Sequence, residues 1–239
     1  MNRVKKILIA FTLIFTWQSA VAAEAEVGGM FALTLNKSFN DYFSMNIQNH
    51  LWLEENFTHM ERYMVGANFK TALIKKHLYF EALYYYRYRN RSGHSENTHR
   101  YQFGLSGVFS LPRVKLSGVS KMESNHVFIS ANDPFNIYFW RNKLAINGIL
   151  KNNNRISPFG SIEVFNQLNW REDFNKMRGY TNQKGVERIW IDLGVDYKIN
   201  KNFILTFSVK EQIIFNLSSS SNKPYKYSTM LGIGCLINL

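Results

Sequence analysis

The sequence is poor in cysteine and proline, with one cysteine and four prolines in 239 residues. A single cysteine excludes an intrachain disulfide framework and a zinc site built on several thiolate ligands. Disorder is excluded as well, because 46% of the residues are hydrophobic. These absences leave a folded chain of one large domain or two small ones.

Negative charge is also scarce. The chain has 17 Asp and Glu against 29 Lys and Arg, which gives a formal net charge of +12. A basic excess of this size suits nucleic acid, an acidic substrate or an anionic membrane surface. The positions of the charges along the chain have to decide among these partners.

The N-terminus carries an apolar run that basic residues precede and small residues follow. Arg3, Lys5 and Lys6 precede the apolar segment Ile7–Trp17, and the small residues Ala20–Ala23 follow it. This order is typical of a secretory signal peptide, and the run is shorter than the roughly 20 residues of a spanning helix. We predict a signal peptide over residues 1–23, with a buried N-terminal helix as the alternative, and a single domain over residues 24–239. Export of the chain argues against a nucleic-acid partner.

Helical spacing of apolar residues is not sustained beyond this segment, and a period of two replaces it. In the stretch 78–90, for example, Leu78 and Phe80 have the opposite parity to Glu81, Arg87 and Arg89. Successive side chains of a strand point to opposite faces, so such a strand has one apolar and one charged face. Eleven segments follow this pattern: 27–36, 43–54, 61–73, 78–90, 98–110, 114–123, 137–150, 156–168, 186–199, 203–215 and 227–239.

The segment lengths favour a membrane-spanning barrel. Most segments exceed the usual soluble strand of about five or six residues and match the roughly 9–11 residues that cross a bilayer at a tilt. Short connections near 37–42, 74–77, 111–113, 151–155 and 200–202 alternate with longer ones near 55–60, 90–97, 124–136, 169–185 and 216–226. We predict an all-β, transmembrane antiparallel up-and-down β-barrel in the bacterial outer membrane, with a soluble sandwich as the alternative.

The predicted strand number is even, ten or twelve, as in bacterial barrels of this type. The apolar alternation Leu231, Ile233, Cys235, Ile237 and Leu239 resembles the C-terminal signal that the barrel-assembly machinery reads. A periplasmic C-terminus then sends the first of the eleven segments downward. Either residues 23–29 supply a short twelfth strand, or the first segment lies outside the closed set.

The charged parity predicts the lining of the lumen, because an Arg or Lys facing lipid at mid-membrane costs about 2–4 kcal/mol. Two interpretations stay open: a structural or small-solute barrel whose lumenal charges neutralise one another, and an anion-preferring porin for small anionic solutes. The predicted lumenal cations are Arg62, Lys70, Arg87, Arg89, Arg100, Lys115, Lys121, Arg141, Lys143, Arg188, Lys198 and Lys210, and the predicted anions are Glu54, Glu81, Glu123, Glu163, Asp192 and Asp196.

Catalysis is not expected, and neither is a cofactor or a metal site. Of six histidines, five lie in or beside predicted connections, and His50 is assigned to the interior of a strand. A hydrolase at the outer rim would use Ser124 with His126, or Ser95 with His94, but no spacing fixes a nucleophile, base and orienting acid together.

Several local phrases, taken in order, resemble a known family. They are Glu61-Arg62-Tyr63, the aromatic run Tyr84–Arg89, Glu163–Asn166, Leu193–Asn202 and the terminal Ile237–Leu239. In this order the chain resembles the small outer-membrane proteins grouped as domain of unknown function 2490, over nearly all of residues 24–239. The resemblance implies an outer-membrane barrel in contact with outer-membrane lipid, and it implies no activity.

Overall fold

A computed structural model describes residues 26–54, 57–91, 94–128, 134–150, 155–169, 184–215 and 225–239. The predicted signal peptide lies outside the described residues. The described part of the chain contains no helix of the length and hydropathy that a membrane span requires. It consists of β1 (Glu26–Ser38), β2 (Phe43–Glu54), β3 (His59–Ile74), β4 (Leu78–Arg91), β5 (His94–Ser110), β6 (Val114–Phe128), β7 (Phe135–Gly148), β8 (Ile156–Gln167), β9 (Gly185–Lys198), β10 (Phe203–Phe215) and β11 (Tyr225–Asn238).

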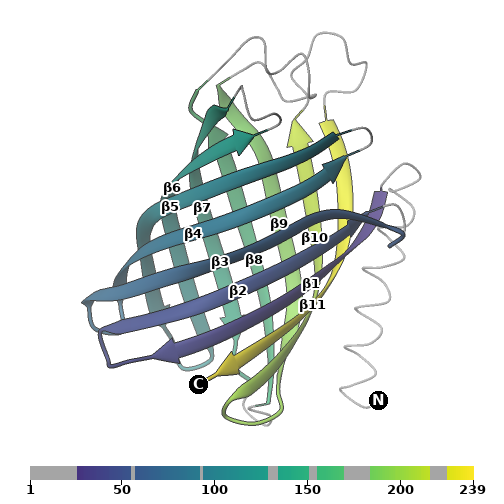
Figure 1. Ribbon diagram of the computed structural model, residues 1–239. Helices are drawn as coiled ribbons and strands as arrows, with labels where there is room; N and C mark the ends of the chain where they lie inside the picture. The colour runs from purple at the N-terminus through teal and green to yellow at the C-terminus, as the bar shows by residue number, and fades with distance from the viewer. Residues whose placement is uncertain are drawn as a thin grey trace.

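The eleven strands form one closed barrel, in which every strand pairs with its neighbours in the chain and β1 pairs with β11 (Figure 1). All pairs are antiparallel except the β1–β11 seam, which is parallel from Glu26 opposite Ser228 to Asn36 opposite Asn238. The predicted number of ten or twelve strands is therefore wrong by one. The requirement for an even number assumes an antiparallel closure, whereas a parallel ladder also satisfies the backbone groups of both edge strands.

The seam also settles the two alternatives for the first segment. Residues 27–36 belong to β1 and lie inside the closed set, against the idea that this segment is left out. Residues 23–29 were the candidate for a twelfth strand, and the described part of them, from Glu26 on, forms the beginning of β1.

The two rims of the barrel differ. Leu239 and the five turns that follow β1, β3, β5, β7 and β9 lie at one end, here called the short-turn rim. The other five connections lie at the opposite end, the loop rim (Figure 1). Two loops predicted to be long, near 55–60 and 90–97, are short, because β3 begins at His59 and β5 at His94. The connections of 168–184 and 216–224 are longer than any at the short-turn rim, as predicted, whereas 129–134 is no longer than the connection of 149–155 at that rim.

Asparagine side chains build two of the tight turns. The Oδ1 atoms of Asn40 and Asn200 each accept a hydrogen bond of 2.8 Å from the backbone N–H two residues further on. Such Asx turns reverse the chain without help from the rest of the fold. Asp41 in the first turn is ion-paired with Lys75 in the next. The hydrogen bond from Lys75 and its positive charge lower the pKa of Asp41.

The outer face of the barrel is apolar over its whole circumference. Large exposed hydrophobic side chains occupy the outward parity of the strands, for example Phe31, Phe69, Phe103, Leu105, Leu144, Ile162, Leu193, Phe207 and Ile233. In water a continuous apolar surface of this extent promotes association, whereas in a bilayer it is the expected lipid-facing band. The chain is thus an all-β barrel of the transmembrane type, and the parity predicted from the sequence is confirmed.

Candidate functional site

The lumen is filled in the half of the barrel next to the loop rim and is more open in the half next to the short-turn rim. Buried lumenal residues concentrate in the half of the strands that adjoins the loop rim, such as Glu61, Arg87, Glu96 and Phe139. Towards the short-turn rim the lumenal side chains are half-buried or exposed, for example Ser44 and Asn147. We call the filled layer of β2 to β9 near the loop rim the constriction.

The predicted cations and anions that define the site lie on the inward parity of their strands. Arg62, Arg87, Arg100, Arg141 and Glu163 are buried in the lumen. Glu123 is buried as well. Less deeply buried members pair across neighbouring strands or within them: Lys70 with Glu81 at 3.0 Å, Arg89 with Glu61, Arg188 with Glu187, Lys210 with Asp192 at 3.8 Å, and Asp196 with Thr206 at 2.6 Å. Lys143 is opposite Glu163 in the strand register. Glu54 and Lys121 are half-buried, and Lys115 and Lys198 are exposed.

Glu123 on β6 is the centre of the polar network. Its side chain is 2% exposed. The carboxylate accepts hydrogen bonds from Gln102 at 2.5 Å and Asn125 at 2.6 Å. Arg100 lies 3.3 Å away as an ion-pair partner, and Arg141 forms a shorter ion pair. Four donors from three strands thus hold one buried charge, which compensates for its removal from water.

Arg141 extends this network to β8. Its guanidinium bridges Glu123 and Glu163, and the distance to Glu163 is 2.8 Å. A bidentate or bridging guanidinium suits a buried site, because its five donors can satisfy two carboxylates at once.

A second set of ion pairs lines the adjoining wall, on β3 to β5. Glu61 pairs with Arg62 at 2.8 Å and also with Arg89. Arg87 donates to Glu96 at 2.7 Å and to the hydroxyl of Thr98 at 2.8 Å. These side chains cross the strand ladders and tie the wall together close to the loop rim.

Two β-bulges supply glutamates that the period-two analysis missed. Glu61 is the extra residue of β3 opposite the step from Trp52 to Leu53, and Glu187 is the extra residue of β9 opposite the step from Phe165 to Asn166. Each bulge turns two successive side chains inward, so that Glu61 lies beside Arg62 and Glu187 beside Arg188. The repeated Glu-Arg dipeptide was the available signal. Glu96 was missed because its strand begins four residues earlier than predicted.

Aromatic rings fill the space between the cations. Trp52 of β2 and Trp190 of β9 approach across the lumen with ring centroids 5.8 Å apart. The guanidinium of Arg62 lies 4.6 Å from the Trp52 ring, and that of Arg141 lies 4.2 Å from the Phe165 ring. Such cation–π contacts stabilise positive charge away from water. Trp52 therefore lies inside the lumen, whereas Trp140 lies outside and is 46% exposed.

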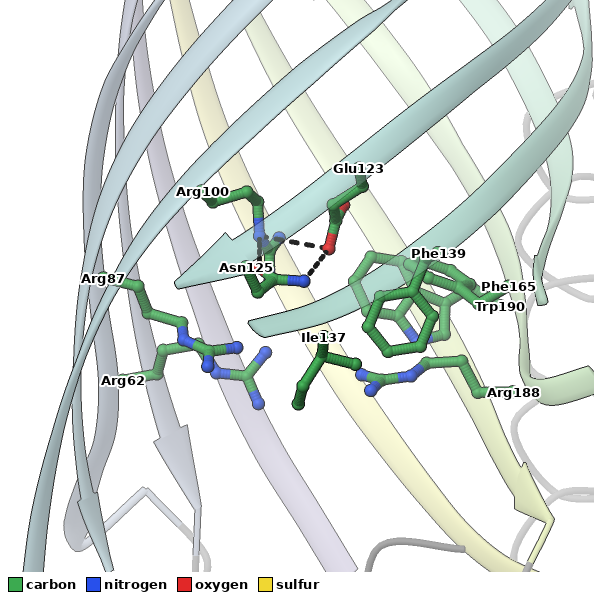
Figure 2. Close-up of a pocket in the computed structure, with 10 residues that line it drawn as sticks. All are labelled: Arg62, Arg87, Arg100, Glu123, Asn125, Ile137, Phe139, Phe165, Arg188 and Trp190. Atoms are coloured by element: carbon green, nitrogen blue, oxygen red, sulfur yellow. Dashed lines mark hydrogen bonds and ion pairs between the residues drawn. The ribbon is translucent and has the colours of Figure 1, made fainter. Parts of the chain in front are cut away.

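A small cavity remains at the centre of the constriction (Figure 2). Its volume is about 20 Å³, and its lining comes from β3 to β9. Figure 2 shows Arg62 and Arg87 on one side of it, Arg188 on the other, and Ile137 between them. A volume of this size holds about one water molecule or one small ion.

The histidine assignments need correction. His59, His94 and His126 lie in β3, β5 and β6 rather than in connections, because these strands are longer than predicted. His99 lies in β5, in the segment predicted for that strand. Ser124 and His126 have the outward parity of β6, and Nδ1 of His126 lies 2.5 Å from Oδ1 of Asn136. The His126 ring packs edge-on against Phe128. Within the described residues no group of three or more potential metal ligands occurs.

Comparisons with known proteins concern the fold. No protein-family model matches the chain, and no curated protein matches it. Among solved structures it is similar to the NanC porin, at 9% identity and a TM-score of 0.48 over 90% of this chain and 99% of that one. The translocator domain of the autotransporter NalP from Neisseria meningitidis matches at 13% identity and a TM-score of 0.47, over 80% of this chain and 73% of that one. An anion-selective porin from Comamonas acidovorans matches at 10% identity and a TM-score of 0.38, over 84% of this chain and 55% of that one.

Proposed function

We propose that the protein is a bacterial outer-membrane barrel whose lumen is closed by the constriction to all but the smallest solutes. In this proposal residues 1–23 direct export, β11 presents the assembly signal to the barrel-assembly machinery, and the apolar outer face contacts outer-membrane lipid. The short-turn rim then faces the periplasm, and the more open half of the lumen forms a periplasmic vestibule. The resemblance to domain of unknown function 2490 stays a prediction that fits this proposal.

The observation that carries the proposal is the filling of the lumen by paired charges and aromatic rings. Trp52 and Trp190 belong to β2 and β9, which are not neighbours in the barrel, and their rings are in contact. The cavity left between the walls has a volume of about 20 Å³. A hydrated solute of metabolite size does not fit through such a layer, so the barrel acts as a structural element of the membrane with at most a narrow path.

Conductance of single molecules in planar bilayers tests this proposal. The wild-type protein is expected to show no stable open channel, or steps far smaller than those of an open barrel. Trp190→Ala removes a ring from the centre of the constriction and is expected to raise the conductance severalfold. Trp140→Ala is the matched control, because it removes the same ring from the outer face. Large stable channels in the wild type, unchanged by Trp190→Ala, contradict the proposal.

A second candidate function, an anion-preferring path, is supported by the sign of the lumenal charge. Among the described residues six arginines of the constriction pair with five glutamates, and Lys121 and Lys143 lie on the same inward parity. A positive wall lowers the barrier for anions relative to cations. If Trp190→Ala opens the path, a salt gradient across the bilayer is expected to shift the reversal potential towards the anion. A shift towards the cation excludes this candidate.

Catalysis is not part of the proposal. An outer-rim hydrolase would depend on Ser124 and His126, so ester release by the purified protein that Ser124→Ala abolishes would require the proposal to be changed.

A further inference from the structure

We propose that the constriction binds one small monovalent anion, of halide size, in the cavity between Arg62, Arg87, Arg100 and Arg188. This inference rests on the proposed function, because it needs a lumen that excludes bulk water at this depth. It adds a specific ligand class and a specific site to the closed barrel.

The first argument is the size and lining of the cavity. Four guanidinium groups from β3, β4, β5 and β9 line about 20 Å³ together with Glu123, Asn125 and apolar side chains such as Ile137 and Phe139. A space of this volume accepts a single water or monatomic ion and is too small for phosphate or a carboxylate metabolite. The shape therefore selects for a small ligand before charge is considered.

The second argument is a pair of donors without acceptors. In the described part of the chain, Nε of Arg62 and Nε of Arg87 are buried and make no hydrogen bond, although both side chains line the cavity. The far ends of the same guanidinium groups are held by Glu61 and Glu96. A buried donor without an acceptor is costly, and the cost rises when the group is charged. An anion in the cavity supplies the missing acceptor for both side chains.

The third argument is the charge of the buried cluster. The part of the chain that the structure describes places six arginines in the constriction, namely Arg62, Arg87, Arg89, Arg100, Arg141 and Arg188, against the five glutamates Glu61, Glu96, Glu123, Glu163 and Glu187. At least one positive charge is left over in a region of low dielectric, where an uncompensated charge is strongly unfavourable. Lys121 and Lys143 lie on the same inward parity and add to this excess. A bound monovalent anion reduces the excess of positive charge.

Bromide is a suitable probe, because it is a halide that quenches tryptophan fluorescence on contact and Trp190 lines the cavity. The experiment titrates the full-length protein, reconstituted in lipid vesicles, with bromide at constant ionic strength against a large organic anion. We expect a saturable quenching component on top of the linear collisional one. The variant Trp190→Phe is expected to lose that component and keep the linear one.

Two variants of the same ion pair separate a binding effect from a folding effect. Arg87→Gln removes a donor and one positive charge, and the apparent bromide affinity is expected to fall tenfold or more, since a hydrogen bond to a charged group is lost. Glu96→Gln disturbs the same pair but raises the net charge of the cluster, so the affinity is expected to rise. Lys70→Gln changes a lumenal cation outside the cavity and is expected to leave the affinity unchanged.

The outcomes decide between the alternatives. Purely linear quenching in the wild type, equal to that of Trp190→Phe, overturns the anion site and assigns the cavity to water. A change of affinity in the same direction for Arg87→Gln and Glu96→Gln also overturns it, because charge then does not control binding. The proposed closure of the lumen is tested separately by conductance, so a failed bromide site leaves the closed barrel standing, and large open channels reject the closure whatever the titration shows.

Discussion

The substitution Glu123→Gln gives the sharpest test of whether the constriction is dry. Glutamine keeps the shape of the side chain and one acceptor oxygen, but it removes the charge that Arg100 and Arg141 share. The carboxylate is almost completely buried and has four donors around it. The change therefore leaves two guanidinium groups with less compensation inside the lumen.

The expected loss follows from the burial of the pair. Removing one partner of a buried ion pair costs about 3–5 kcal/mol, because the other charge stays in a low-dielectric site. Since glutamine retains one acceptor and Glu163 still holds Arg141 at 2.8 Å, we expect a loss at the lower end, about 3 kcal/mol in the free energy of unfolding. An exposed pair contributes far less, because water solvates both charges.

Urea-induced unfolding in phospholipid vesicles, followed by tryptophan fluorescence and by the heat-dependent shift of the folded barrel on gels, measures this loss. Asp41→Asn is the control, since it breaks the exposed pair with Lys75 in the turns and is expected to change nothing measurable. A loss for Glu123→Gln below about 1 kcal/mol, as for surface pairs, would show that water solvates the network. The lumen would then be a hydrated channel, and the closed constriction would be refuted.

Two further predictions concern the barrel wall. Gly66→Ala is expected to lower the free energy of unfolding by about 1–3 kcal/mol, because its Cβ would collide with the backbone of the neighbouring strand and the Tyr85 ring. Gly107→Ala is the control. The nearest atom to its Cβ would be 3.9 Å away, so no change is expected in the same unfolding assay. Position 33 lies in register with Cys235 across the seam, so mild oxidation of the Leu33→Cys variant is expected to form a disulfide and a faster band on non-reducing gels. Leu35→Cys, two pairs further on, is not expected to form it. Equal cross-linking of both variants contradicts the register of the seam.

Strand periodicity was sufficient to assign most of the lumen and the whole lipid face. Arg87 and Arg141 are inside and Leu144 is outside because alternation is strict along those strands and lipid rejects charge. The rule fails where a bulge adds a residue. Strict alternation turns Glu61 or its neighbour Arg62 towards lipid, and the bulge avoids that cost by turning both inward. A Glu-Arg dipeptide in a segment that otherwise alternates between apolar and polar residues therefore indicates such a bulge.

The lengths of the loops and the way in which the barrel closes are not indicated by any comparable pattern in the sequence. His94–Asn97 is polar at every position and was assigned to a loop, yet it extends β5, since residues near a rim need no apolar face to continue a ladder. The direction in which β1 meets β11 depends on pairing between segments about 200 residues apart. Nothing in either segment distinguishes a parallel from an antiparallel partner. The eleven segments were therefore visible in the sequence, but their closure by a parallel pair comes only from the three-dimensional structure.

The parallel seam fixes where the two ends of the described barrel emerge. Glu26, at the beginning of β1, lies at the loop rim, and Asn238, at the end of β11, lies at the short-turn rim. In an even-stranded barrel the first strand begins on the side where the last strand ends, and a short linker can join these two ends. Here a linker would have to run the length of a 13-residue strand, about 40 Å at the usual rise. Epitopes placed at the two ends should therefore be accessible from opposite sides of one membrane, and the fold should resist circular permutation.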